Sequence, residues 1–90
     1  MPAELEEKTD RYERLLAEAL TAADPADGRE SDAAECLEMA RSYLEDGRHF
    51  RETGDPVNAL AAFSYGHGWL DAGARLGALD VPGDGELFTV

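Results

Sequence analysis

The residues best suited to chemistry lie in one stretch, in which Tyr65, His67, Trp69 and Asp71 alternate with small or apolar residues. His67 could act as a general base or a metal ligand, because an imidazole changes its protonation near neutral pH. However, side chains two positions apart on a helix do not face each other. Two steps of the helix place His67 about 160° from Trp69. We therefore expect a half-buried structural histidine, and keep a chemical role as the alternative.

Asp71 and Arg75 stand four residues apart, which is the spacing of an ion pair on a helix surface. We expect such a surface pair, and the alternative is a recognition strip that includes Ser64 and Gly68. Ser64 has no evident base with an orienting partner, so nucleophilic catalysis is not indicated. The glycines of this stretch are spread through a helical pattern and are not gathered before a helix, so a phosphate-binding loop is not indicated either.

The side chains that could ligate a metal or hold a cofactor are few and scattered, so no metal and no cofactor are predicted. His49 has no second ligand at helical spacing, and it could bind a metal only if the fold brought it near Asp55 or His67. The single cysteine, Cys36, excludes an internal disulfide and a cysteine cluster. Its place in a helical pattern predicts a small buried side chain.

Apolar residues at helical spacing predict three helices, over about residues 4–23, 31–53 and 55–77. The connections between them are short, which makes consecutive helices antiparallel neighbours. The expected fold class is all-α, an up-and-down three-helix bundle forming one domain over residues 1–79. Residues 80–90 are rich in proline and glycine and predict a non-helical C-terminal tail. We expect this tail to be mobile with partial contact to the bundle.

Three residues mark the junction between the second and third helices. Gly54 predicts the end of one helix, Asp55 the N-cap of the next and Pro56 its first residue. The second helix is expected to begin at Ser31 or at a capping box that starts at Asp32.

Two packing features follow from the helical patterns. Gly47 lies on the predicted buried face of the second helix, which indicates close contact with a bulky partner, Phe63 or Trp69. The third helix is apolar over a wide arc, so it is either central in the bundle or carries a second interface.

The charge of the chain limits its partners. The net charge is −12, with one lysine, Lys8, against seven arginines. Without a basic patch, direct binding to a nucleic-acid backbone is not expected. High acidity with little lysine is typical of a cytoplasmic protein from a salt-loving organism, because high salt screens self-repulsion. The alternative is an ordinary acidic bacterial or archaeal protein. The acidic N-terminal residues argue against a signal peptide, and no apolar run is long enough to span a membrane.

The stretch from Gly54 to Gly77 resembles an archaeal family, domain of unknown function family number 357. The residues that carry this resemblance are Tyr43, the Gly54-Asp55 turn, Ala59-Leu60, Tyr65, Gly68, Leu70-Asp71-Ala72 and Leu76-Gly77. The resemblance covers roughly residues 10–79 and leaves the tail outside. It implies an up-and-down three-helix bundle and supplies no activity. The same stretch is also similar to half of a tetratricopeptide unit, but no second copy follows at that spacing.

These observations favour a small protein–protein interaction or self-association module over an enzyme. The candidate surface comprises Tyr65, His67, Trp69, Asp71 and Arg75. The alternative is a small helical enzyme or nucleotide-binding domain, with a site between the second and third helices near His49, Asp71 and Arg75. A third possibility is an accessory protein of RNA or DNA machinery that binds other proteins. No membrane partner is expected.

Overall fold

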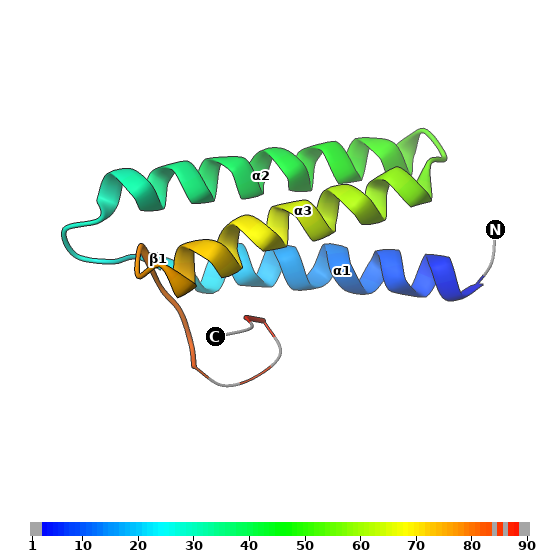
Figure 1. Cartoon of the computed structure of the whole chain (residues 1–90). Coiled ribbons are helices and arrows are strands. Elements are labelled where there is room, and N and C mark those ends of the chain that lie inside the picture. The colour runs from blue at the N-terminus through cyan, green and yellow to red at the C-terminus, as the bar shows by residue number, and fades with distance from the viewer. Residues whose placement is uncertain (1–2, 84, 86, 89–90) are drawn as a thin grey trace.

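Three helices make up most of the chain, and each runs antiparallel to the one before it (Figure 1). The computed structural model describes residues 3–83, 85 and 87–88. Helix α1 spans Ala3–Ala22, α2 spans Glu30–Glu52 and α3 spans Pro56–Arg75. The fold class is therefore the all-α three-helix bundle that the sequence predicts, and each helix begins and ends within two residues of its expected bounds.

Helix α3 is the central element, because it packs against both α1 and α2, whereas α1 and α2 meet at fewer places. Phe63 and Leu70 of α3 and Leu16 of α1 are fully buried between the helices. The apolar core continues through small residues and leucines from all three helices and the segment after α3: Ala19, Ala23, Ala33, Leu37, Ala40, Leu44, Ala59 and Leu79. Many alanines let the helices approach closely but bury little area each, so the few large side chains contribute most of the buried apolar surface.

Glycines permit the closest approach of α2 and α3. A Cβ atom at Gly47 would lie 2.2 Å from Cε1 of Phe63, so the ring occupies the space that a side chain would need. This confirms the predicted contact and selects Phe63 over Trp69 as the partner. Farther along the pair, a Cβ at Gly66 would lie 3.2 Å from the carbonyl oxygen of Ala40.

The α2–α3 junction has the predicted chemistry. Gly54 adopts a φ of 78°, which is the left-handed conformation that ends a helix. The side chain of Asp55 accepts a hydrogen bond of 3.1 Å from the backbone N–H of Asn58, and Pro56 is the first helical residue. A tight turn therefore reverses the chain and places α3 directly against α2.

The predicted cap of α2 is wrong. The helix begins at Glu30, and its N-cap is Arg29, which makes no side-chain capping bond. The Asp32 carboxylate instead accepts a hydrogen bond of 3.1 Å from Nε of Arg29, while the carboxylate of Glu30 accepts one of 3.0 Å from the N–H of Gly28. Because the helix already begins at Glu30, Asp32 lies within its first turn and is not the N-cap.

A short strand pair, which the sequence analysis did not predict, joins the loop after α1 to the segment after α3. Strand β1 (Asp24–Pro25) pairs antiparallel with β2 (Leu79–Asp80). The N–H of Ala26 also donates to the carbonyl oxygen of Ala78 at 2.9 Å. Gly77, with a φ of 81°, ends α3 earlier than expected and turns the chain toward this pairing.

Ion pairs link α1 to α2 near the other end of the bundle. Glu13 accepts from Nη1 of Arg51 at 2.8 Å and from Nε of Arg48 at 3.0 Å, and Arg51 also pairs with Asp10. The hydrogen bonds to Asp10 and Glu13 raise the pKa of Arg51 above its ordinary value. Because these pairs are partly exposed, each contributes about 1 kcal/mol or less to the stability of the α1–α2 contact.

The described part of the tail folds back toward the bundle (Figure 1). Val81, Leu87 and Phe88 are partly buried and pack against the core cluster. The described residues of the tail are non-helical and make partial contact, as expected, and the mobility of the tail stays a prediction. Within the part of the chain that the structure describes, no helix is long and apolar enough to cross a membrane.

Candidate interaction surface

The outer face of α3 is the most exposed apolar surface of the bundle. Among the described residues, four large apolar side chains are exposed, and three of them lie on α3 or directly after it: Val57 at 63%, Tyr65 at 67% and Leu76 at 72%. Packing against two neighbours covers only part of a helix that is apolar over a wide arc. The uncovered part is the surface that the sequence could not assign to the core or to an interface.

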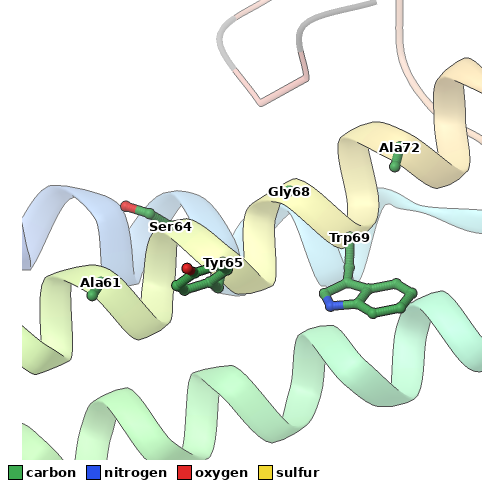
Figure 2. A pocket seen from close by; sticks show the side chains of 6 residues that line it. All are labelled: Ala61, Ser64, Tyr65, Gly68, Trp69 and Ala72. Carbon is green, nitrogen blue, oxygen red and sulfur yellow. The ribbon is translucent and has the colours of Figure 1, made fainter.

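A shallow apolar groove of about 600 Å³ runs along this face. Its lining consists of Ala61, Ser64, Tyr65, Gly68, Trp69 and Ala72, all from α3. Figure 2 shows the side chains of Tyr65 and Trp69 pointing from α3 toward α2, whereas Ser64 points away from α2. The floor is formed by small residues, and two aromatic side chains border it on one side.

Tyr43 of α2 supports the more exposed of these aromatic side chains. Its ring stacks on that of Tyr65, with centroids 5.7 Å apart and planes inclined by 22°. Stacking restricts the Tyr65 ring although the side chain is mostly exposed. A large aromatic side chain held in place on the surface loses little conformational entropy when a partner covers it.

The charges of the bundle are not shared equally among the helices. Helix α1 carries six acidic residues against three basic ones, and α2 carries seven against three. Helix α3 carries one of each, Asp71 and Arg75. The apolar groove therefore lies on the helix without net charge, in a chain whose net charge is −12.

His67 lies on a different side of α3, where the tail covers it. Its Nε2 donates a hydrogen bond to the carbonyl oxygen of Leu87, and its ring is tilted against that of Phe88 at a centroid distance of 6.1 Å. The imidazole is partly buried, as the structural interpretation predicts. Its position away from Trp69 also agrees with the helical geometry.

A smaller depression of about 260 Å³ lies between α1, α3 and the tail. It is lined by Tyr12, Leu15, Ser64, His67, Gly68, Asp71 and Leu87. Four of the five candidate residues divide between two regions, since Tyr65 and Trp69 line the groove whereas His67 and Asp71 line the depression; Arg75 lines neither of them. Only Ser64 and Gly68 line both.

His49 is not brought to the other candidates. It is exposed in the last turn of α2. Because Gly47 lies against Phe63 and the two helices are antiparallel, His49 lies near the start of α3. At 1.5 Å per residue, Asp71 is about 15 Å farther along. The geometry does not support a site between α2 and α3 that uses His49, Asp71 and Arg75, and the Asp71–Arg75 pair itself stays a prediction.

The polar groups of the bundle do not point to a bound ligand. In the described ranges, no three histidine, cysteine or carboxylate side chains are grouped to hold a metal ion. No buried side-chain nitrogen or oxygen of these residues lacks a hydrogen-bond partner. Cys36 is half-buried, and desolvation, followed by the charges of Asp32 and Glu35, raises the pKa of its thiol. A raised pKa keeps the thiol protonated and unreactive.

The fold and the groove on α3 together define the class of protein: a three-helix bundle whose central helix leaves an uncharged apolar face uncovered. The chain belongs to the family described as protein of unknown function (DUF357), whose model matches residues 11–79. The match extends to Leu79, so it includes the residues that join β2 to the bundle. No curated protein and no solved structure matches the chain.

Sequence reasoning identified Tyr65 and Trp69 but missed other parts of the apolar face. Val57, Ala61, Ala72 and Leu76 continue it in both directions, and Tyr43 supports it from α2. The signal was present in the spacing, because residues 57, 61, 65, 68, 72 and 76 follow one another at intervals of three or four. It could not be separated from the core-facing stripe until the sides covered by α1 and α2 were known.

Proposed function

We propose that the protein is a protein–protein interaction module that binds through the outer face of α3. The observation that carries the proposal is the exposure of Val57, Tyr65 and Leu76 along an apolar groove on the one helix without net charge. Exposed apolar surface of this kind usually marks an interaction site. Tyrosine and tryptophan are also the side chains that most often dominate binding free energy.

Sedimentation or light scattering in molar salt, combined with affinity purification at the same salt, tests this proposal. We expect either self-association or a retained partner, and replacement of Tyr65 by serine should abolish it. Tyr12→Ser is the matched control, because Tyr12 is 36% exposed and lies on α1 outside the groove. A strict monomer that retains no partner, or a loss of binding that is equal in both variants, would remove the basis of the proposal.

One observation bears on the alternative, a small helical enzyme or nucleotide-binding domain. Ser64, His67 and Asp71 share the smaller depression at helical spacing. A serine nucleophile needs one imidazole nitrogen as its base, while the other donates to an orienting carboxylate. In this bundle Nε2 of His67 donates to the Leu87 carbonyl, which leaves one nitrogen for both roles. We therefore favour the interaction module over the enzyme.

We further propose that this module is cytoplasmic and works at high salt. The net charge of −12 with a single lysine supports this, because self-repulsion destabilises a compact acidic chain until salt screens it. Thermal unfolding between about 0.1 M and about 2 M KCl is the measurement, and the midpoint should rise across this range. A midpoint that falls or stays level would favour an ordinary acidic protein.

A further inference from the structure

We propose that the occupant of the α3 face is a second copy of this chain, whose α3 packs antiparallel across a two-fold axis. This inference rests on the proposed function and specifies its partner. Electrostatic repulsion favours this face over the other two helices. Helix α1 has a net charge of −3 and α2 a net charge of −4. Contact between two copies through either helix would therefore bring like charges together. Helix α3 has a net charge of zero, so contact there separates the acidic surfaces.

The spacing of the exposed residues along α3 also fits a second copy. The positions 57, 61, 65, 68, 72 and 76 are separated by intervals of 4, 4, 3, 4 and 4 residues. This order is the same in both directions along the helix. Two such helices can pack antiparallel about a two-fold axis that passes at the level of the Gly66–His67 peptide bond. Each of these positions then lies opposite another position of the same set in the second copy. The matched segment, 57–76, is about 28 Å long.

The residues that this register brings together are also complementary in size. Tyr65 faces Gly68 of the second copy, and Trp69 faces Ser64, so each large aromatic side chain meets a small residue. A Cβ built at Gly68 has no atom within 4 Å, so the space above it is open to receive a tyrosine ring. Ala61 faces Ala72, which allows the two helices to approach closely. A two-fold axis repeats each of these contacts, so every complementary pair of residues occurs twice in the interface.

The exposed apolar residues at the ends complete the match. In the same register, Val57 faces Leu76 of the second copy, and these two are 63% and 72% exposed in the single chain. Dimerisation would thus cover the three large apolar side chains that α3 and its C-cap leave exposed. A basic partner is the competing occupant, because α2 is acidic, but the apolar groove has no charged residue in its lining.

Cysteine cross-linking tests the partner and the register together. The experiment uses the full chain with Cys36→Ala, so that no native thiol remains. The double substitution Ala61→Cys with Ala72→Cys should form a covalent dimer on mild oxidation, because each cysteine faces its counterpart. Either substitution alone should remain uncross-linked, since its copies lie 11 residues apart along the axis, about 16 Å, beyond the roughly 7 Å limit for a disulfide. Mixing the two single variants should restore cross-linking.

Parallel packing makes the opposite prediction, because Ala61→Cys alone would then cross-link to itself. That result, or equal cross-linking of both single variants and the double variant, would overturn the antiparallel register.

A second variant tests the same contact without cysteines. Gly68→Leu fills the space assigned to Tyr65 of the second copy, and a Cβ atom at this position meets nothing within 4 Å. We expect a folded monomer whose dimer dissociation constant in molar salt rises at least about tenfold, as measured by sedimentation equilibrium. An unchanged dissociation constant would contradict the contact.

The outcomes also separate this inference from the proposed function. A chain that is monomeric in molar salt but binds a different protein through Tyr65 would overturn the second copy as occupant and leave the interaction module standing. A dimer that is insensitive to both Tyr65→Ser and Gly68→Leu would refute the two proposals together, because the interface would then lie elsewhere.

Discussion

Replacement of Gly47 by alanine tests the closest packing in the bundle, because two physical effects predict opposite signs. Helix propensity alone predicts that the change stabilises α2 by about 1 kcal/mol. The new Cβ, however, would lie 2.2 Å from Cε1, 2.6 Å from Cδ1 and 2.8 Å from Cζ of Phe63. Carbon atoms in contact are about 3.5–4.0 Å apart, so the ring would have to move by more than about 1 Å.

The surroundings of Phe63 determine the magnitude. The side chain is fully buried, so it cannot move into solvent. Overpacking of a core costs about 1–3 kcal/mol, and we expect the upper end of this range because the displacement exceeds an ångström. After subtraction of the propensity gain, the net loss in free energy of unfolding is about 2 kcal/mol. For a domain of this size the midpoint of thermal unfolding should fall by about 8–16 °C.

Gly68→Ala is the matched control, because Gly68 is also within a helix but a Cβ there meets no atom within 4 Å. In the monomer it should raise the free energy of unfolding by about 1 kcal/mol, whereas any loss of dimer contacts above Gly68 would show only at the higher protein concentration. Chemical denaturation at two protein concentrations measures both variants and reveals any contribution from association. Addition of Phe63→Leu to Gly47→Ala should show strong coupling, since the smaller side chain relieves the overlap. If Gly47→Ala stabilises as much as Gly68→Ala, the inferred contact is absent and the reasoning fails.

Three further predictions concern the ends of the helices. Asp55→Ala should lower the free energy of unfolding by about 1 kcal/mol, because the first turn of α3 loses its cap; Asp55→Asn should retain most of the stability, and equal losses would contradict the capping role. The pKa of Glu30 should lie below that of an ordinary glutamate in a carboxyl NMR titration, because its own N–H and then that of Gly28 stabilise the charged carboxylate. A folded pKa below the unfolded one stabilises the fold above the unfolded pKa, and this contribution is lost as the pH falls through the folded pKa; Glu30→Gln should remove that pH dependence, and a folded pKa at or above the unfolded one would refute the contact. Leu79→Ala should cost about 2–4 kcal/mol in denaturation experiments, since Leu79 is 3% exposed after α3 has ended; a cost below about 1 kcal/mol would place the segment on the surface.

Local chemistry made the helical framework predictable. The Gly54-Asp55-Pro56 junction combines a left-handed stop, a side-chain cap and a residue preset for the first turn, and each requirement is met by one residue type. Gly47 was informative for a related reason. A glycine on a buried helical face is unfavourable by itself, so its presence indicated a neighbour that needs the space.

The missed features depend on residues that are distant in sequence. Asp32 fits a capping box by spacing, but α2 already begins at Glu30. The N-cap residue Arg29 donates to the carboxylate of Asp32 and to the carbonyl oxygen of Leu76, the latter at 3.0 Å. The pairing of β1 with β2 joins segments about fifty residues apart, and no local pattern encodes it. The placement of His67 under Leu87 has the same origin. For the candidate surface, the exposed residue types were evident, but the sides of α3 that remain uncovered depend on how the other two helices pack.

The unequal contacts among the three helices have a consequence for how the bundle opens. The contact between α1 and α2 is less extensive than the contact between α3 and α2. Ion pairs of Glu13 with Arg48 and Arg51 form part of the α1–α2 contact. The hairpin of α2 and α3 is joined by a tight turn and by the packing of Phe63 on Gly47. Opening should therefore begin with α1 leaving the hairpin as one cooperative unit. Amide hydrogen exchange would then show α1 exchanging at a lower free energy than α2 and α3.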